Sequence, residues 1–287
     1  MTGDDVSARA NRPLLRPADG LAALPARPAT GPAVGTPAWP SFTGTAQQVG
    51  TSSTGVTVYV DPALGAPALQ NAHDLLAGAD RVVAQNNTIF GTAGGPVSAI
   101  VFALNGKTDG TGGADHGGCD FTTGNAIEID ASFGNPARIT ALFEAELSEC
   151  SMNNQLCGLS TGEALSRWCA AVVSANALAD FATAPQWAGD GMPNWVDQTE
   201  ATDQSADSTG CGMAFLSWLL SQHHTLPEIA QAMVGLGDTG TLATLYAKLT
   251  GGSAPSAWPA FETAVKGIAG GVTSDDPFNG IASAGVG

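Results

Sequence analysis

Basic side chains are scarce in this sequence. It contains ten Lys and Arg residues against 26 Asp and Glu residues, and its formal net charge is −16 at pH 7. Four of the arginines lie near the N-terminus, at positions 9, 12, 16 and 27, so the rest of the chain carries the other six of the ten basic residues. Such a surface repels phosphate backbones and anionic lipid headgroups. We therefore expect no nucleic-acid partner, whereas a protein or peptide partner remains open.

Long apolar runs are also absent. No stretch reaches the ~18 consecutive apolar residues typical of a membrane span, and the best candidate, 165–184, is interrupted by Arg167, Asn176 and Asp180. We expect no membrane span. The N-terminus lacks the apolar core of a standard signal peptide, so the signal has been removed, export uses another route, or the protein stays inside. Charged residues make up only 13% of the whole chain, and small residues are abundant. This composition is typical of extracellular bacterial proteins, and we expect an extracellular or periplasmic location.

The five cysteines include no C-x-x-C pair, which argues against a structural zinc site. Cys150 and Cys157 flank a short polar turn and could close a small loop. In an oxidising compartment we expect two disulfides and one buried thiol. The alternative is five reduced thiols.

Several enzyme signatures are missing. The sequence has no G-x-S-x-G nucleophile motif, no phosphate-binding P-loop and no dinucleotide-binding glycine pattern. A glycosidase could use Glu146 with Asp120 or Glu149, but Glu146 and Glu149 lie one helical turn apart and would not straddle a sugar ring. Four aspartates within 190–207 lack EF-hand spacing, so a solvated loop is expected there, with weak Ca²⁺ binding as the alternative.

The pattern of the chain predicts an α+β fold. Residues 1–52 are rich in Pro, Ala and Gly without an apolar period, and we interpret them as a flexible or surface-hugging leader. Residues 53–287 are expected to form a single globular domain, with a small twisted sheet and a helix in the N-terminal half and a helical C-terminal half. The expected strands are 55–61, 96–104 and 125–131 (an edge strand), and the expected helices are 66–85, 135–152, 160–182, 211–222, 225–235, 241–251 and 256–269.

The helix that begins at Asn135 (N-cap) and Pro136 carries three glutamates. At about 100° per residue, one stripe of this helix gathers Ile139, Leu142, Phe143, Leu147 and Cys150. Glu146 falls inside this apolar stripe, Glu149 lies along its edge, and Glu144 points to the opposite side. We therefore expect Glu144 to be solvated and Glu146 to be buried.

A buried carboxylate needs a compensating partner, because an isolated buried charge costs several kcal/mol. Glu146 must be protonated, hydrogen-bonded, paired with a cation such as Arg167, or bound to a metal ion. The carboxylates of Glu146, Glu149 and Glu163, with no histidine among them, would suit a hard cation such as Ca²⁺ better than zinc.

The order of strand, helix, strand, glycine-rich loop, edge strand and glutamate-bearing helix over about residues 55–185 resembles the core of the zincin-type metallopeptidases. In these, the last helix carries H-E-x-x-H, and in the gluzincin arrangement a later helix adds a glutamate as third zinc ligand. This sequence has "AELSE" at 145–149 in the place of that motif.

The resemblance implies that Glu146 matches the catalytic general base. Ala145 and Glu149 replace the two zinc-binding histidines, and Glu163 matches the third ligand. An alanine cannot coordinate zinc, and catalytic zinc sites usually have three protein ligands including histidine. A simpler role for Glu163 is helix capping, because Ser160 and Glu163 form the pattern of a capping box.

His116 lies in the glycine-rich loop 105–124 and could face the same cleft as Glu146, although a loop histidine among glycines is more often exposed. Our first hypothesis is a catalytically degenerate zincin-like protein that binds a partner and needs no cofactor. The alternative is a metal-dependent hydrolase with a carboxylate centre of Glu146 and Glu149, helped by His116 or Glu163 and by a divalent cation such as calcium.

Overall fold

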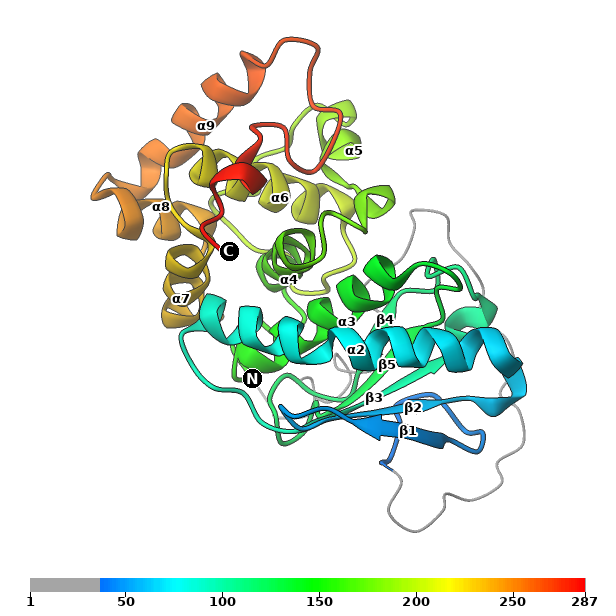
Figure 1. Cartoon of the computed structure of the whole chain (residues 1–287). Coiled ribbons are helices and arrows are strands. Elements are labelled where there is room, and N and C mark those ends of the chain that lie inside the picture. Colours follow the sequence, from blue (N-terminus) through cyan, green and yellow to red (C-terminus); the bar gives the residue numbers. More distant parts are fainter. Residues whose placement is uncertain (1–36, 287) are drawn as a thin grey trace.

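The computed structural model describes residues 37–286. Its strands are β1 (Gln47–Thr51), β2 (Val56–Val60), β3 (Val97–Phe102), β4 (Ala114–His116) and β5 (Ala126–Asp130). Its α-helices are α2 (Gly65–Phe90), α3 (Pro136–Ser151), α4 (Ser160–Val173), α5 (Ala184–Gly189), α6 (Ala206–Ser221), α7 (Leu226–Leu236), α8 (Leu242–Thr250) and α9 (Ala257–Lys266). All five strands lie in the first half of the chain and most of the helices in the second, which confirms the α+β class (Figure 1).

The five strands form one mixed sheet in the order β1-β2-β3-β5-β4. β2, β3 and β5 are parallel to one another, while β1 and β4 run antiparallel to their neighbours. The prediction that 125–131 forms an edge strand was wrong, because β4 covers the outer side of β5. β4 comes from the glycine-rich segment that the sequence indicated only as a loop. This short strand brings His116 to the edge of the sheet, opposite Ile127.

Helix α2 covers one face of the sheet (Figure 1). Its inward stripe includes Ala68, Ala72, Leu75, Ala79 and Val82, all fully buried. The helix runs five residues past the predicted end at residue 85 and stops at Gly91, which adopts the left-handed conformation with φ 68°. The spacing of small and branched apolar residues thus positions the helix against the parallel strands.

The opposite face of the sheet carries a second small core. Tyr59, Ile100, Phe102 and Leu104 pack there against Trp39 and Phe42 from the segment before β1. Glu128 of β5 accepts hydrogen bonds from the backbone N–H groups of Ser41 and Phe42 at 2.9 and 2.6 Å. The folded part therefore starts before the boundary at residue 52 that the composition suggested, whereas residues 1–36 of the expected leader lie outside the described residues.

Helices α3 and α4 link the sheet to the helical half (Figure 1). α3 begins as predicted, since the Asn135 side chain accepts a hydrogen bond from the backbone N–H of Arg138 and Pro136 is the first helical residue. α4 has Leu159 as its N-cap and no side-chain cap, so the predicted capping box of Ser160 and Glu163 does not form.

The C-terminal helices share the apolar core of α3 and α4. Phe261 of α9 lies at the centre of an aromatic cluster with Trp187, Phe215, Trp218 and Trp258. α6, α7, α8 and α9 match the four helices that the sequence predicted from 211 onward. Within residues 37–286, no helix is both long and apolar enough to span a membrane.

Candidate functional site

Three side chains that the sequence singled out meet at the junction of β4 and α3. The Nε2 atom of His116 lies 3.1 Å from Oε2 of Glu149 and 3.6 Å from Oε2 of Glu146. The three residues are 2%, 4% and 0% exposed, respectively. We call this group the His116 cluster. The expectation of an exposed loop histidine was therefore wrong, and Glu146 is buried as predicted.

The orientation of the His116 ring follows from the short turn after β4. Nδ1 is in hydrogen-bonding contact with the carbonyl oxygen of Gly118, which can only accept, so Nδ1 carries a proton. Nε2 faces two carboxylates, which are acceptors when ionised. Both nitrogens are thus placed to donate, as in a charged imidazolium.

The electrostatics of the cluster support this protonation. Burial alone lowers the pKa of His116, but hydrogen bonds with Cys150 and Glu149 and the charge of Glu146 raise it well above its ordinary value. Burial raises the pKa of Glu146 well above its usual value, and the positive charge of His116 opposes this rise. The imidazolium therefore supplies the compensating charge that a buried carboxylate on α3 requires.

Further carboxyl groups surround the cluster. Glu163 of α4 is 4% exposed, and burial raises the pKa of its side chain well above the usual value, although the charge of Arg167 opposes this. Its Oε2 atom has no hydrogen-bond partner. Glu146 and Glu149 both raise the pKa of Glu163, so α4 faces the cluster as the sequence suggested.

Arg167 does not pair with Glu146, contrary to one of the alternatives drawn from the sequence. Its guanidinium forms an ion pair with Asp275 at 2.6 Å and donates a hydrogen bond to the hydroxyl of Thr183 at 3.0 Å. These contacts tie α4 to the C-terminal segment. The cation beside Glu146 is His116, which the helical wheel could not reveal because β4 lies far away in the sequence.

Glu144 is buried rather than solvated. It is 0% exposed, and neither of its carboxyl oxygens has a hydrogen-bond partner. Burial raises the pKa of Glu144 well above its usual value, and only the charge of Arg81 on α2 opposes this. The prediction failed because α3 has no solvent-facing side. Every residue from Arg138 to Cys150 is buried between the sheet, α2 and α4.

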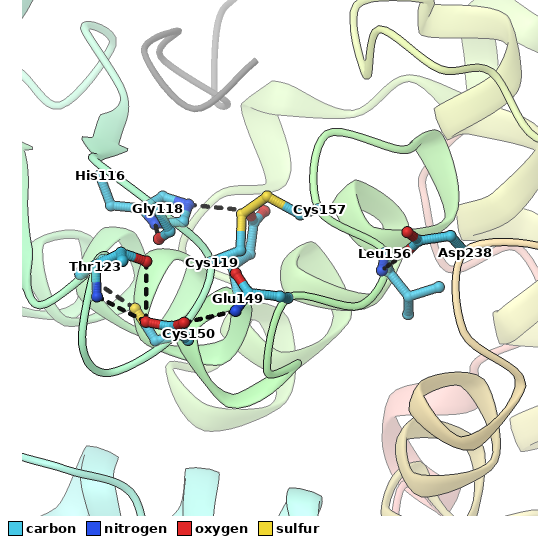
Figure 2. The surroundings of a disulfide bond; sticks show 12 residues. His116, Gly118, Cys119, Thr123, Glu149, Cys150, Leu156, Cys157 and Asp238 are labelled. Carbon is cyan, nitrogen blue, oxygen red and sulfur yellow. Dashed lines mark hydrogen bonds and ion pairs between the residues drawn. A yellow bond between two sulfur atoms is a disulfide. The ribbon is translucent and has the colours of Figure 1, made fainter. Parts of the chain in front are cut away.

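One disulfide, Cys119–Cys157, connects the glycine-rich segment to the turn after α3 (Figure 2). The predicted loop closure between Cys150 and Cys157 was wrong. Cys150 remains a buried thiol, and its Sγ donates to the carbonyl of Gly124 at 3.3 Å. The expected second disulfide is absent from the described residues, which include all five cysteines.

The residues do not fit the zinc site that the resemblance implies. Ala145 occupies the place of a ligand, is 1% exposed and has only a methyl side chain. A different set of donor atoms comes together nearby. A ring nitrogen of His116, Sγ of Cys119 and a carboxylate oxygen of Glu149 lie within 4.8 Å of one another, and this is the only such group found in residues 37–286.

Among the described residues, the four aspartates between 190 and 207 do not bring three donor atoms this close together, so they do not form a metal site of this kind. Asp203 is 7% exposed, so this segment is not fully solvated, contrary to the expectation, and Asp207 lies in the first turn of α6. Asp203 also raises the pKa of Glu146 and of Glu163, which places this loop near the His116 cluster.

Comparisons with protein-family models, with curated proteins and with solved structures found no match.

Proposed function

We propose that this chain is a zincin-like protein that lacks metal-dependent catalysis and acts as a binding module for a protein or peptide partner. The observation that supports this most directly is the position of His116. Its imidazolium lies between Glu146 and Glu149, the two residues that the resemblance assigns to the catalytic base and a replaced zinc ligand. The chain's own cation thus balances the charge that a metal ion balances in a peptidase.

The order of elements supports the same proposal. β2, α2, β3, the glycine-rich segment with β4, β5 and α3 follow one another in the order on which the resemblance rests. Such an order places the glutamate-bearing helix directly after a strand of the sheet. The cluster is also almost fully buried, so no face of Glu146 is open to a substrate carbonyl or a catalytic water.

The charge of the molecule favours a basic partner. Three of its basic side chains are already in ion pairs, namely Arg138 with Asp180, Arg167 with Asp275 and Lys266 with Glu262. With a formal net charge of −16, the protein therefore offers mainly carboxylates to a partner. Electrostatic complementarity speeds the association of such a surface with a basic protein or peptide and makes it sensitive to salt. The disulfide fits an oxidising, extracellular or periplasmic location.

Metal analysis of the disulfide-bonded protein tests the loss of catalysis. We expect substoichiometric metal, no hydrolysis of a mixed peptide library, and the same melting temperature with and without a chelator. Binding of a lysine-rich peptide, measured by calorimetry, should weaken steeply as salt is added. Stoichiometric metal that disappears in Glu149→Ala, together with peptide cleavage, would refute the proposal.

One observation favours the alternative, a metal-dependent hydrolase. Both carboxyl oxygens of Glu146 and one of Glu163 have no hydrogen-bond partner, as carboxylates awaiting a hard cation such as Ca²⁺ would. Calcium titration of the disulfide-bonded protein separates the two functions. A rise in melting temperature with calcium that is lost in Glu146→Gln supports the hydrolase, whereas an unchanged melting temperature supports the binding module.

A further inference from the structure

The Cys119–Cys157 disulfide lies directly beside the His116 cluster (Figure 2). Sγ of Cys119 is within 4.8 Å of the donor atoms of His116 and Glu149, yet in the disulfide this sulfur cannot act as a thiolate ligand. An imidazole nitrogen, a thiolate and a carboxylate are a donor set that suits Zn²⁺ and similar divalent ions, and does not suit Ca²⁺ or Mg²⁺. The disulfide therefore blocks one ligand of an otherwise assembled set.

We propose that His116, Cys119 and Glu149 form a zinc-binding site that becomes available only when the Cys119–Cys157 disulfide is reduced. The ligands in a tetrahedral zinc site lie roughly 3.3–3.8 Å apart, as its bond lengths of about 2.0–2.3 Å require. Nε2 of His116 already lies 3.1 Å from Oε2 of Glu149, so only the separations from Cys119 Sγ, at most 4.8 Å, need to shorten, by about 1 Å. This inference goes beyond the binding function proposed above.

The surroundings of His116 already have the form that a zinc ligand needs. Its Nδ1 contacts the carbonyl oxygen of Gly118, which fixes the ring and directs Nε2 toward the carboxylates. Metal-binding histidines commonly use their second nitrogen in this way. Independent support comes from Glu146. It is 0% exposed, has no hydrogen-bond partner for either oxygen, and has Oε2 3.6 Å from the same Nε2 atom. This carboxylate is placed to complete the coordination of an ion held by the other three side chains.

Cys119 remains in place when the disulfide is broken. Its carbonyl oxygen accepts a hydrogen bond of 2.7 Å from the backbone N–H of Asn154, in the turn after α3. The side chain of Asn154 also donates to Asp120 at 2.5 Å. Two hydrogen bonds thus join the same two segments as the disulfide, and they keep the sulfur close to His116 after reduction.

The geometry also determines how reduction proceeds. Cys157 is half-buried while Cys119 is 3% exposed, so a reducing dithiol reaches the sulfur of Cys157 first. Its thiolate attacks Cys157 Sγ, forms a mixed disulfide and releases Cys119 as a thiolate. The second thiol of the reductant then breaks the mixed disulfide, so that the reductant becomes a disulfide and Cys157 a free thiol. Zn²⁺ takes the released thiolate of Cys119 as a ligand.

A matched pair of variants tests the proposal. Cys157→Ser and Cys119→Ser abolish the same disulfide, but only Cys157→Ser leaves the thiol at position 119. We expect Cys157→Ser to bind one Zn²⁺ per chain without any reductant, at least about 100-fold more tightly than Cys119→Ser. Both variants keep the buried thiols Cys150, Cys169 and Cys211, so these thiols contribute equally to the two measurements.

Cobalt serves as the spectroscopic probe. Co²⁺ bound to Cys157→Ser should give a thiolate-to-metal charge-transfer band in the near ultraviolet, and this band should be absent with Cys119→Ser. The full-length wild type, titrated with Zn²⁺ before and after reduction by a phosphine, gives the same comparison if Cys157→Ser does not fold. Equal zinc affinity of the two variants, or of oxidised and reduced wild type, would overturn the proposal. The oxidised protein alone tests the loss of catalysis, so the two proposals can fail separately.

Discussion

The buried carboxyl of Glu144 leads to the sharpest prediction about stability. It lies on α3 between Arg81 of α2 and Cys169 of α4, and both of its oxygens lack a hydrogen-bond partner. An unsatisfied buried polar group costs about 1–3 kcal/mol. Replacing it with methionine, which has a similar length and no charge, should therefore stabilise the protein by about 2 kcal/mol. At about 2–4 °C per kcal/mol, the melting temperature should rise by about 4–8 °C.

The gain should depend on pH in a defined direction. A carboxyl whose pKa is raised by folding binds its proton more tightly in the folded state than in the unfolded state. Its contribution to stability is full below the ordinary value of 4.5 and is lost as the pH rises toward the folded pKa. The advantage of Glu144→Met should thus grow above that pH, by at most about 1.4 kcal/mol per unit.

Urea denaturation at about pH 5 and about pH 8 measures both quantities. Glu262→Met is the matched control, because Glu262 is partly exposed on α9 and pairs with the exposed Lys266. It should change the free energy of unfolding by less than about 0.5 kcal/mol at both pH values. If Glu144→Met destabilises the protein, or if its effect does not vary with pH, then Glu144 is ionised and has a partner, and the reasoning is refuted.

Three further predictions concern the sheet, the cluster and the disulfide. His116→Gln removes the cation between two buried carboxylates and should cost about 3–5 kcal/mol in urea denaturation. Burial raises the pKa of Asp130 from 3.8 to about 7, so wild-type stability should fall across this pH range, and Asp130→Asn should remove up to about 4 kcal/mol of that fall. The disulfide between Cys119 and Cys157 spans 38 residues. For a loop of this length, the double substitution to serine should cost about 4 kcal/mol.

Each of these results has a control. His73→Gln alters a histidine exposed on α2 and should leave the stability unchanged. Asp74→Asn on the same helix removes a carboxyl that is only partly buried and is the control for Asp130→Asn. A His116→Gln protein of wild-type stability would show that His116 does not compensate the buried carboxyl groups of Glu146 and Glu149. An unchanged pH profile in Asp130→Asn would mean that Asp130 is ionised throughout, and a disulfide-free protein of wild-type stability would show that the link does not restrict the unfolded chain.

Capping signals in the sequence predicted the start of a helix correctly where the capping side chain and the backbone group it binds are close in sequence. Asn135 and Pro136 start α3 as expected, because an N-cap side chain and a fixed φ act within a few residues. The equally local capping box at Ser160 does not form. The Ser160 hydroxyl instead accepts a hydrogen bond of 3.0 Å from the backbone N–H of Glu200, a residue 40 positions away. The backbone N–H of Glu200 thus occupies the hydroxyl oxygen that the capping-box pattern expected to accept a hydrogen bond within α4.

The candidate site was predicted only in part for a related reason. The apolar stripe correctly placed Glu146 inside, but the same helical wheel placed Glu144 outside. A wheel assumes one solvent-facing side, and α3 has none because α2 and α4 cover it. Likewise, close spacing suggested that Cys150 pairs with Cys157, whereas the fold turns Cys150 toward Gly124 and brings Cys119 to Cys157.

The sequence by itself determined the class of fold, most helices, three of the five strands and the burial of Glu146, because apolar periodicity and end signals act over one or two turns. It missed β1, β4 and α5, and it extended α4 beyond its end at Val173. Only the tertiary structure decided what compensates that buried charge. The pairing of β4 with β5 brings His116 to Glu146 and Glu149, which lie 30 and 33 residues further along the chain. No periodicity encodes such a contact, since it depends on how the glycine-rich segment folds back along the sheet.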